Sequence, residues 1–412
     1  MDGPIIIVSY IFPPSLEARG LQVAKLVKYT SRLGRPCEVV TKAISAPHAS
    51  LDNSEGWMSN VPDLKVHRCG SMPKGPLGGT LVRLLAKPGF GWARNAAALV
   101  SERIAATTAD GFACVMTCAM PMYSHLVGLS LKRRFPGLPW IAHFSDPWAE
   151  TPYPIRYRAI NSRIRRILEG RVLERADMVV FPSEELKDFM LEAYGASFRR
   201  KFFVLPHVYD PGLYGTRAVE SDGLLRLAHV GGLNKVRGGD PLYHVLKKLV
   251  ADGIPLDRLR IQLVGPAMQG DREVIDDMYP GLVERLGQVR YVESLRIMSA
   301  ADCLLLIDAD IGSSPFFPSK LADYFGSGRP VIGITPSGSC SSNLLREQGF
   351  PVFDYDQLGE LAHYLGNIIL GNTRLPRPNQ EKLERYSAER VAGEFISLAA
   401  RAQSLCSTAH AD

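Results

Sequence analysis

Short apolar runs alternate with longer amphipathic stretches along almost the whole sequence, and this alternation is typical of repeated βα units on parallel sheets. The strands predicted in the first half are Ile5–Ser9, Cys37–Thr41, Leu64–His67, Ala113–Thr117, Trp140–Phe144, Met178–Phe181 and Phe202–Leu205. Those predicted in the second half are Leu225–Val230, Arg260–Val264, Val289–Tyr291, Cys303–Ile307, Pro330–Ile334 and Pro351–Phe353. Two such sets imply an α/β protein with two similar sheets.

A segment rich in turn residues separates the two sets. Pro206 begins it, and Asp210, Pro211 and Gly212 are the residues expected in a connection between domains. A length of 412 residues also suits two domains with separate cores. We therefore predict an N-terminal domain at 1–205, a linker at 206–223, a C-terminal domain at 224–385, and a C-terminal helix and tail at 386–412 that can pack back on the N-terminal domain.

Composition excludes several classes of protein. With 46% hydrophobic and 22% charged residues, the sequence is typical of a globular protein and not of a disordered or fibrous one. No run reaches the roughly 18–20 apolar residues of a membrane-spanning helix, and the start does not read as a signal peptide, so we expect a cytoplasmic protein. The net charge of +6 suits an anionic ligand or a membrane surface and does not indicate a nucleic-acid binder.

The cysteines and acidic pairs give little sign of a metal site. Seven cysteines are scattered, most of them within apolar strands, and none forms a C-x-x-C pair, so reduced buried thiols are expected. Asp308 and Asp310 have a spacing that metal-binding carboxylates use, but the polar end of a strand is the simpler interpretation. We therefore expect no metal and no bound cofactor.

A glycine-rich loop in the second half is the first candidate site, because ligands of doubly wound sheets lie beyond the carboxyl ends of the strands. The strand that ends at Val230 runs into the loop 231–239, which also carries Lys235 and Arg237. Glycines let backbone N–H groups approach an anion and the two cations supply opposite charge, so the loop is a candidate phosphate site. A flexible loop with solvated cations is the alternative.

A second candidate follows the strand that ends at Ile307. Ser319 and Lys320 are expected to begin a helix whose positive end faces the ligand. Asp323 lies one turn further on, where a carboxylate can accept hydrogen bonds from a ribose diol. An exposed acid near the start of a helix is the alternative for Asp323.

The first half also places polar residues at the ends of its strands. His143 and Asp146 lie where a strand ends, a position suited to acid–base chemistry or to recognition of a hydroxyl group. The loop after the first strand, which includes Pro14, Arg19 and Gly20, is expected to face the same ligand-binding cleft. A core histidine and a turn-forming aspartate before a proline are the alternatives.

A basic helix is predicted within 156–175. This range carries seven arginines and only two acids, while Ile164, Ile167, Leu168 and Val172 recur at helical spacing. One face can therefore be buried while arginines cover the other. The Arg156–Arg175 region suits an anionic membrane surface, and a solvated basic helix is the alternative.

These motifs, taken in order, resemble the GT-B glycosyltransferases, in particular glycosyltransferase family 4 and its bacterial surface-polysaccharide members. The segments that carry the resemblance are Phe12-Pro13-Pro14, Asp146-Pro147-Trp148, Gly231 to Gly238, Gly265-Pro266, Gly287 to Asp302, and Pro318 to Pro330. The resemblance implies two Rossmann-like domains that face each other across a cleft, with the acceptor on the N-terminal side and a nucleotide sugar on the C-terminal side. It also implies a retaining reaction that needs no metal.

The resemblance assigns roles on the donor side. Arg237 occupies the position of the family's diphosphate-binding lysine, Lys320 lies in the loop that meets the same phosphates, and Asp323 falls where the family's second glutamate holds the ribose. Backbone contacts around Gly265 and Val292 are expected to select the base. The donor-binding residues expected in full are Gly231, Gly232, Lys235, Arg237, Gly265, Val292, Ser319, Lys320 and Asp323.

The sequence departs from the family pattern at two positions. Gly232 stands where the family usually has an arginine, and Pro315 stands at the first glutamate of its paired-glutamate motif. Lys320 suggests the variant subgroup that has proline, serine and lysine before this helix. His143 and Asp146 are expected to orient the acceptor hydroxyl, whose proton the leaving phosphate can take in a retaining enzyme.

The sequence therefore predicts an enzyme that transfers a sugar from a UDP- or GDP-sugar to a lipid-linked or polysaccharide acceptor at the inner face of a bacterial membrane. A nucleotide-sugar epimerase of the same fold is one alternative. A non-catalytic nucleotide-sugar-binding homologue is another, suggested by Gly232 and Pro315. A dinucleotide oxidoreductase is disfavoured, because no predicted strand is followed by a G-x-G-x-x-G turn.

Overall fold

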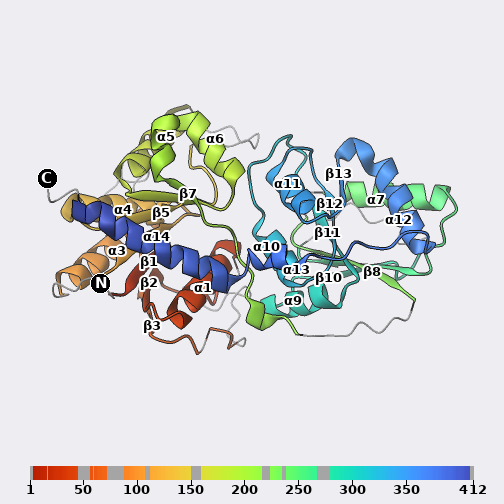
Figure 1. Cartoon of the computed structure of the whole chain (residues 1–412), viewed down its shortest axis with the longest axis horizontal. Helices are drawn as coiled ribbons and strands as arrows, with labels where there is room; N and C mark the ends of the chain where they lie inside the picture. The colour runs from red at the N-terminus through yellow and green to blue at the C-terminus, as the bar shows by residue number, and fades with distance from the viewer. Residues whose placement is uncertain are drawn as a thin grey trace. The chain divides into compact units, whose positions relative to one another are not determined.

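The chain forms two compact units, each drawn in Figure 1. The first contains Met1–Val208 and Ala388–Asp412, and the second contains Tyr209–Ser387, so the units divide within the predicted linker 206–223. The computed structural model describes residues 3–15, 17–44, 56–58, 60–71, 88–106, 112–149, 159–215, 223–233, 238–266 and 279–408.

The first unit is built on a seven-stranded parallel sheet. Its strands are β1 (Ile5–Ser9), β2 (Cys37–Lys42), β3 (Leu64–Cys69), β4 (Cys114–Cys118), β5 (Trp140–His143), β6 (Met178–Phe181) and β7 (Phe202–Val204). They lie in the order β3-β2-β1-β4-β5-β6-β7. The strand order therefore reverses between β1 and β4, which is where a doubly wound sheet opens a crevice for ligands.

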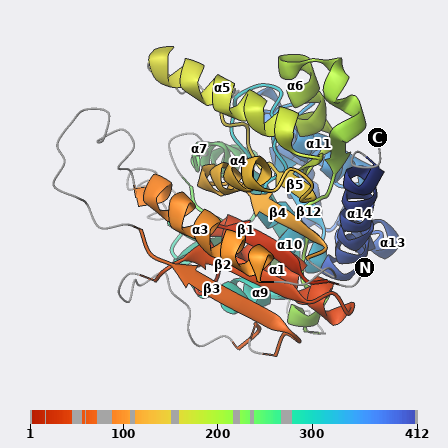
Figure 2. The ribbon, with the colours of Figure 1, turned by 90° about the vertical axis from the view of Figure 1, so that its left-hand side faces the viewer.

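Helices cover both faces of this sheet, because alternate residues of each buried strand point to opposite sides. Ile5 and Ile7 of β1 belong to one buried cluster, and Ile6 and Val8 belong to another. The first cluster lies under α1 and α14, and the second lies under α3 and α4, which run side by side in Figure 2. The helices of this unit are α1 (Ala18–Arg32), α3 (Pro88–Ala105), α4 (Tyr123–Arg134), α5 (Ala159–Arg175), α6 (Glu184–Tyr194) and α14 (Ala388–Thr408), with a short 3₁₀ helix at Ala196–Lys201.

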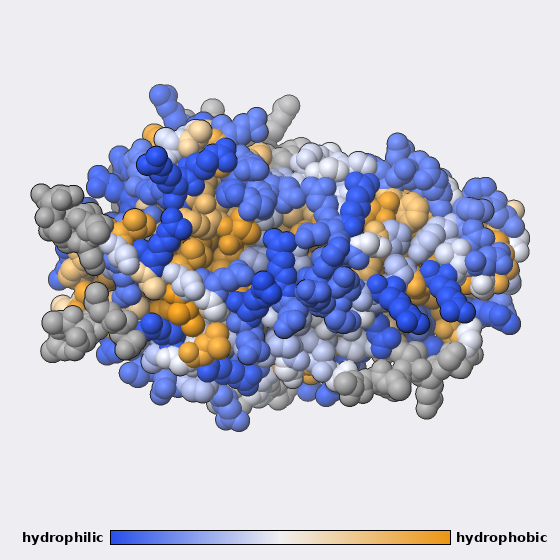
Figure 3. All heavy atoms as spheres, viewed as in Figure 1, coloured by the Kyte–Doolittle hydropathy of each residue, from blue (hydrophilic) through white to orange (hydrophobic). Residues whose placement is uncertain are grey.

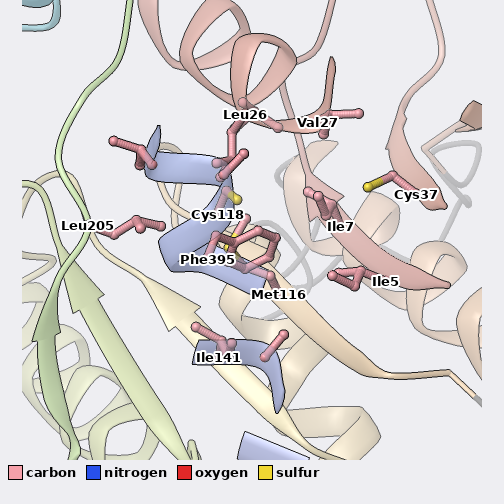
Figure 4. Packing of buried hydrophobic residues seen from close by; sticks show 14 of the residues in the cluster. Ile5, Ile7, Leu26, Val27, Cys37, Met116, Cys118, Ile141, Leu205 and Phe395 are labelled. Atoms are coloured by element: carbon pink, nitrogen blue, oxygen red, sulfur yellow. The ribbon is translucent and has the colours of Figure 1, made fainter. Parts of the chain in front are cut away.

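The C-terminal helix α14 completes the core of the first unit. Phe395 is fully buried and packs among residues of β4, β5 and α1, including Met116 and Leu26 (Figure 4). The chain leaves this unit beside α1, where Gln22 exchanges two hydrogen bonds with the backbone of Val208 and Lys25 Nζ donates to Val208 O at 2.9 Å. Burial of a lysine and a glutamine here is offset by these hydrogen bonds.

The second unit repeats the topology with a six-stranded parallel sheet. Its strands are β8 (Leu225–Val230), β9 (Leu259–Val264), β10 (Val283–Gly287), β11 (Cys303–Ile307), β12 (Val331–Ile334) and β13 (Val352–Phe353), in the order β10-β9-β8-β11-β12-β13. The helices are α7 (Asp240–Ala251), α9 (Tyr291–Ala300), α10 (Ser319–Gly326), α11 (Cys340–Glu347), α12 (Leu358–Ile369) and α13 (Gln380–Glu384), with 3₁₀ helices at Pro211–Leu213 and Tyr355–Gln357. Both units are therefore Rossmann-like.

The predicted strands agree with the observed ones to within one or two residues, with one exception. The strand predicted at Val289–Tyr291 is wrong: the third strand of the second unit is β10, and Tyr291 begins helix α9. Strand β10 lies at the sheet edge and is half exposed, so its sequence does not show the apolar run of a buried strand. Gly287 ends it with φ +63°, a conformation that favours glycine.

The molecular surface in Figure 3 is mostly hydrophilic on the face shown. An apolar patch on that face lies where Figure 1 draws β7 and α14. Phe203 of β7 and Leu398 of α14 are partly buried against the core, and the guanidinium group of Arg401 lies 4.7 Å from the centre of the Phe203 ring. The long arginine side chain therefore covers part of this apolar surface.

None of the helices in the described ranges is long and apolar enough to cross a membrane.

Candidate functional site

In the second unit, two glycine turns meet at the carboxyl ends of β8 and β9. Gly231 N–H donates to Val264 O at 2.7 Å, and Gly265 N–H donates to Gly287 O at 2.7 Å. Both glycines have positive φ, and a Cβ on Gly265 would lie 2.7 Å from Gly231 O. Only glycine fits at this close approach of two backbones. The predicted donor residues Gly231 and Gly265 are therefore adjacent, although 34 positions separate them.

Lys320 reaches this glycine turn from a distant part of the sequence. It lies in the first turn of α10, directly after Ser319, and a Cβ on Gly231 would be 3.1 Å from Lys320 Cδ and 3.2 Å from its Nζ. The side chain therefore lies against the turn after β8. A helix N-terminus, a cation and a glycine turn together form a good environment for a phosphate group.

Tyr324 fixes α10 against the same strand, a role for which there is no local signal in the sequence. The tyrosine is fully buried, its hydroxyl accepts from Val230 N–H at 2.8 Å, and it lies 3.2 Å from Val230 O and 3.3 Å from Leu305 O. Burial raises the pKa of this hydroxyl, so it stays protonated and can donate. Tyr324 therefore holds the first turns of α10, and with them Lys320, next to the end of β8.

Asp323 is buried, so it is not the exposed acid that was the alternative for this residue. Its Oδ1 accepts from the Tyr291 hydroxyl at 3.0 Å and from the Tyr214 hydroxyl at 3.2 Å. Burial, followed by the charge of Asp323, raises the pKa of Tyr214 well above its usual value. The carboxylate that we expected to hold a ribose therefore organises two tyrosines, and sequence analysis did not single out either of them.

Of the other predicted donor residues, some have a described position and some do not. Val292 lies in the first turn of α9 instead of following a strand. Gly232 packs near Pro266, with a Cβ position 3.4 Å from the proline Cγ, so the two glycine turns remain in contact there. Lys235 and Arg237 lie outside the described residues.

In the first unit, a polar cluster is buried at the carboxyl ends of β4 and β5. Arg19, in the first turn of α1, is 9% exposed, and its Nη2 has no hydrogen-bond partner among the described residues. His143, at the end of β5, is 5% exposed, and its Nδ1 likewise has none there. Both side chains line a cavity of about 20 Å³, together with Gln22, Val23, Leu26, Met116, Cys118, Leu205, Pro206, His207 and Val208.

Electrostatics keep the histidines of this cluster neutral. Burial, followed by the charge of Arg19, lowers the pKa of His125 to about 3 and holds the pKa of His143 and of His207 well below the usual range. Burial also lowers the pKa of Arg19, while Cys118 and Asp146 oppose that shift. The cluster therefore concentrates hydrogen-bonding groups and the buried cation Arg19 at a strand end, an environment that favours a polar or anionic guest.

The loop that carries Asp146 is held by a residue of α5. Glu169 is fully buried, and its carboxylate accepts hydrogen bonds from the backbone N–H groups of Trp148 and Ala149 and from the Tyr194 hydroxyl. Sequence analysis counted Glu169 only as an acid within a basic run. Asp146 itself is partly exposed and interacts electrostatically with Arg19, so the two predicted site residues lie near each other.

The first loop of this unit packs closely on its helix. A Cβ on Gly20 would lie 3.0 Å from Ile11 Cγ2, so glycine allows α1 to start directly against the loop. Pro14 lies in a turn within the same loop, next to Pro13, whose carbonyl accepts from Arg68. The loop also joins α4, because Tyr10 N–H donates to Ser124 Oγ at 3.2 Å. Of the predicted acceptor-side residues, Pro14 thus lies in the loop, while Arg19 and Gly20 lie in the first turn of the helix that packs on it.

Helix α5 presents the basic surface that was predicted at Arg156–Arg175, of which 156–158 lie outside the described residues. Ile164 and Ile167 are 47% and 49% exposed, next to the exposed Arg163 and Arg166. Val172 and Glu169 form the buried side. The exposed isoleucines show that the apolar residues of this helix are not all used for packing within the unit.

Across the residues that the structure describes, no group of three or more His, Cys, Asp or Glu side chains is placed to hold a metal ion.

Comparison with protein families bears on the first unit. Residues 20–206 match the family model described as Glycosyl transferase 4-like domain. This range contains α1, the buried cluster around Arg19 and His143, and the Asp146 loop. A search of curated protein sequences finds no match to the chain.

Comparison with solved structures extends over the whole chain. A sucrose-phosphate synthase from Thermosynechococcus elongatus superposes with a TM-score of 0.68 at 15% identity, over 96% of this chain and 98% of that one. A lipopolysaccharide outer core galactosyltransferase gives 0.58 at 12% identity, over 96% and 98%. An E. coli structure described as trehalose-6-phosphate bound with UDP-2-fluoro glucose gives 0.64 at 11% identity, over 97% and 99%.

At identities this low, the superpositions establish a shared fold, and the roles of single residues have to be argued from this chain's own geometry. The neighbours match both units, and in each unit the parallel strand order is that of a Rossmann-like sheet. The two-domain GT-B fold that the sequence predicts is therefore confirmed. The match of the first unit to a glycosyltransferase 4-like domain and the GT-B neighbours of the whole chain together support a glycosyltransferase.

Proposed function

We propose that this chain transfers a sugar from a nucleotide-sugar donor, a UDP- or GDP-sugar, to a lipid-linked or polysaccharide acceptor in bacterial cell-surface polysaccharide biosynthesis. The observation that carries the proposal is the position of Lys320 against the glycine turn at Gly231, at the N-terminus of α10. Backbone N–H groups, a helix N-terminus and an ammonium group suit the diphosphate of such a donor. A neighbour bound with UDP-2-fluoro glucose agrees with this class of ligand.

The proposed chemistry depends on stabilising the leaving group. When the bond from the sugar to the diphosphate breaks, negative charge grows on the phosphate oxygens. We propose that Lys320 and the positive end of α10 stabilise that charge in place of a metal ion or cofactor. In a reaction that retains configuration, the departing phosphate can take the proton of the attacking hydroxyl group.

The acceptor is proposed to bind at the first unit. Arg19, His143 and Asp146 supply a buried cation, a neutral imidazole and a carboxylate at neighbouring strand ends. Asp146 orients the acceptor hydroxyl, and the loop that Glu169 anchors holds Asp146 in position. Replacing Asp146 with alanine is expected to lower kcat by more than about tenfold; a smaller loss would remove it from the reaction.

The acceptor class rests on two observations. The exposed isoleucines and arginines of α5 suit a peripheral position on the anionic inner face of a membrane, where lipid-linked acceptors are found. A lipopolysaccharide outer core galactosyltransferase is among the structural neighbours. We therefore place the protein in the cytoplasm, in contact with the membrane.

The test is a product analysis with UDP- and GDP-sugars, in the presence and absence of a membrane lipid extract. Transfer predicts release of nucleoside diphosphate that rises strongly when the extract is added, together with sugar in the lipid fraction. Conversion of the donor sugar without any acceptor would identify an epimerase instead. Nucleotide binding without turnover under either condition would identify a non-catalytic homologue, which the residues Gly232 and Pro315 suggest.

A further inference from the structure

Helices α3 and α4 enclose a groove on the outside of the first unit. The groove has a volume of about 600 Å³ and is lined by side chains at helical spacing, Phe90, Ala93, Arg94, Ala97, Ala98 and Ser101 on α3 and Leu126, Ser130, Arg133 and Arg134 on α4. Small residues form most of its floor, so the backbones of the two helices leave space between them. The stripe on α3 spans 12 residues, Phe90 to Ser101, or roughly 17 Å at the rise of an α-helix. We call it the α3–α4 groove.

The two ends of the α3–α4 groove differ in character. At one end, Phe90 packs against Tyr123 at a ring-centre distance of 5.5 Å, with Leu126 one turn further along α4. At the other end, Arg133 and Arg134 occupy the last turn of α4. The groove therefore has aromatic side chains at one end, with Arg94 one helical turn from Phe90, and two adjacent arginines at the other end.

The arginines of the groove have no acidic partners within the described part of the chain. Arg94, Arg133 and Arg134 are exposed and take part in no ion pair there, and Arg134 lies over the ring of Phe135. By contrast, Lys132, the neighbour of Arg133 on α4, is mostly buried and pairs with Asp177 at 2.7 Å. Three unpaired arginines beside an apolar floor are complementary to a ligand that carries both an anionic group and an apolar chain.

The shape and charge of the groove select among occupants. The chain's own segment 72–87, which directly precedes α3, carries Lys74, Arg83 and Lys87 and no acid, so its charge is not complementary to the arginines. A phospholipid has one anionic phosphate at the end of a long apolar chain, which matches a groove that is basic at one end and apolar along its floor.

We propose that the α3–α4 groove binds an anionic phospholipid of a bilayer, with the phosphate on Arg133 and Arg134 and part of an acyl chain along Ala97, Ala98 and Leu126. This goes beyond the proposed function, because the groove lies outside the residues assigned to sugar transfer and would hold lipid whether or not the chain transfers a sugar. The groove is also separate from the basic surface of α5, because all of the described residues that line it belong to α3 and α4.

The first experiment tests the phosphate end with vesicles. The purified chain is sedimented with vesicles of phosphatidylglycerol and phosphatidylcholine in equal parts, and with phosphatidylcholine alone. We expect binding to the anionic vesicles only, and a loss of about tenfold or more in the partition coefficient for the variant Arg133→Ser, Arg134→Ser. The matched control is Arg374→Ser, Arg377→Ser, which removes two exposed arginines from the second unit and is expected to change binding little.

The second experiment tests the acyl chain. Ala98 is exposed, so Ala98→Trp can fill the groove without entering the core, and Ala98→Ser keeps the space open. We expect Ala98→Trp to lower partition to anionic vesicles by at least about fivefold and Ala98→Ser to leave it unchanged. Circular dichroism and thermal unfolding check that each variant is folded.

Three results would overturn the proposal. The first is that the wild-type chain does not bind anionic vesicles. The second is that Arg133→Ser, Arg134→Ser and the control Arg374→Ser, Arg377→Ser lose binding equally, while Ala98→Trp has no effect. That result would show a general attraction between a basic protein and an anionic surface. The third is loss of binding in Arg163→Ser, Arg171→Ser while the groove variants still bind, which would assign the membrane contact to α5.

Discussion

Buried charge and buried imidazoles give the first unit its most distinctive residues. Arg19 is almost fully buried beside His125, His143 and His207, and the pKa values of all three histidines are lowered by burial first and by the charge of Arg19 next. Each histidine is therefore neutral in the folded protein at neutral pH. In the unfolded chain each regains an ordinary pKa of about 6.5.

Stability is expected to fall in mild acid for this reason. Between about pH 3 and pH 6.5 the unfolded chain binds more protons than the folded one, so stability is full above about pH 6.5 and is lost as the pH falls. Each histidine contributes a slope of up to about 1.4 kcal/mol per pH unit. Urea unfolding at several pH values should show this slope, and His125→Gln should reduce it. An unchanged slope in that variant would show that His125 is not held neutral.

Two elements carry the candidate site because buried polar side chains hold them in place. The Asp146 loop is held by Glu169 of α5, and the first turns of α10 are held by Tyr324 against β8. In both cases a buried polar group satisfies backbone N–H groups that would otherwise lose hydrogen bonds on burial. The geometry of the site therefore depends on how the Asp146 loop and α10 are held, and not only on the residues proposed to touch substrate.

Removal of the Glu169 carboxylate is expected to release the Asp146 loop. Glu169→Ala leaves the N–H groups of Trp148 and Ala149 without their acceptor, which should lower the free energy of unfolding by about 2–4 kcal/mol and also lower kcat. Glu174→Ala is the matched control, since it removes an exposed acid from the same helix. If urea unfolding and turnover give the same values for the two variants, Glu169 does not anchor the loop.

The sequence predicted elements better than it predicted contacts. Apolar periodicity located the strands, and it failed only at β10, whose edge position leaves it half exposed. Glycine and lysine chemistry located Gly231 and Lys320 as separate motifs. Their proximity, and the bonds of Asp323 with Tyr214, depend on chain folding across about a hundred residues, which no local pattern records.

At the scale of the whole molecule, the core of the first unit depends on a helix that follows the entire second unit in sequence. Helix α14 belongs to the first unit although the complete second unit precedes it in sequence, and Phe395, Val391 and Ala399 lie in the core beneath the sheet. The first unit is therefore discontinuous, and its core is incomplete until α14 has been synthesised. The apolar area that α14 covers on α1 would otherwise face water.

Truncation after Ser387 is expected to prevent stable folding of the first unit. Loss of Phe395 alone removes a fully buried aromatic side chain, a change that typically costs about 3–5 kcal/mol, and the helix supplies several further core residues. Soluble yield, thermal unfolding and binding of a hydrophobic dye measure the effect, with a chain that ends at Thr408 as the control. A soluble, cooperatively unfolding protein that ends at Ser387 would contradict this account of the core.

The central claim for the whole molecule is that the second unit binds a nucleoside diphosphate through the Gly231 turn and Lys320. Calorimetric titration of the intact chain with UDP, GDP and ADP tests it most directly, alongside the variants Lys320→Ala, Lys320→Arg and, as a distant control, Arg374→Ala. The account predicts micromolar binding of UDP or GDP, a loss of at least about tenfold in Lys320→Ala, partial recovery in Lys320→Arg and no change in Arg374→Ala. Failure of the folded wild-type chain to bind any of the three nucleotides, or equal binding by Lys320→Ala, would contradict it.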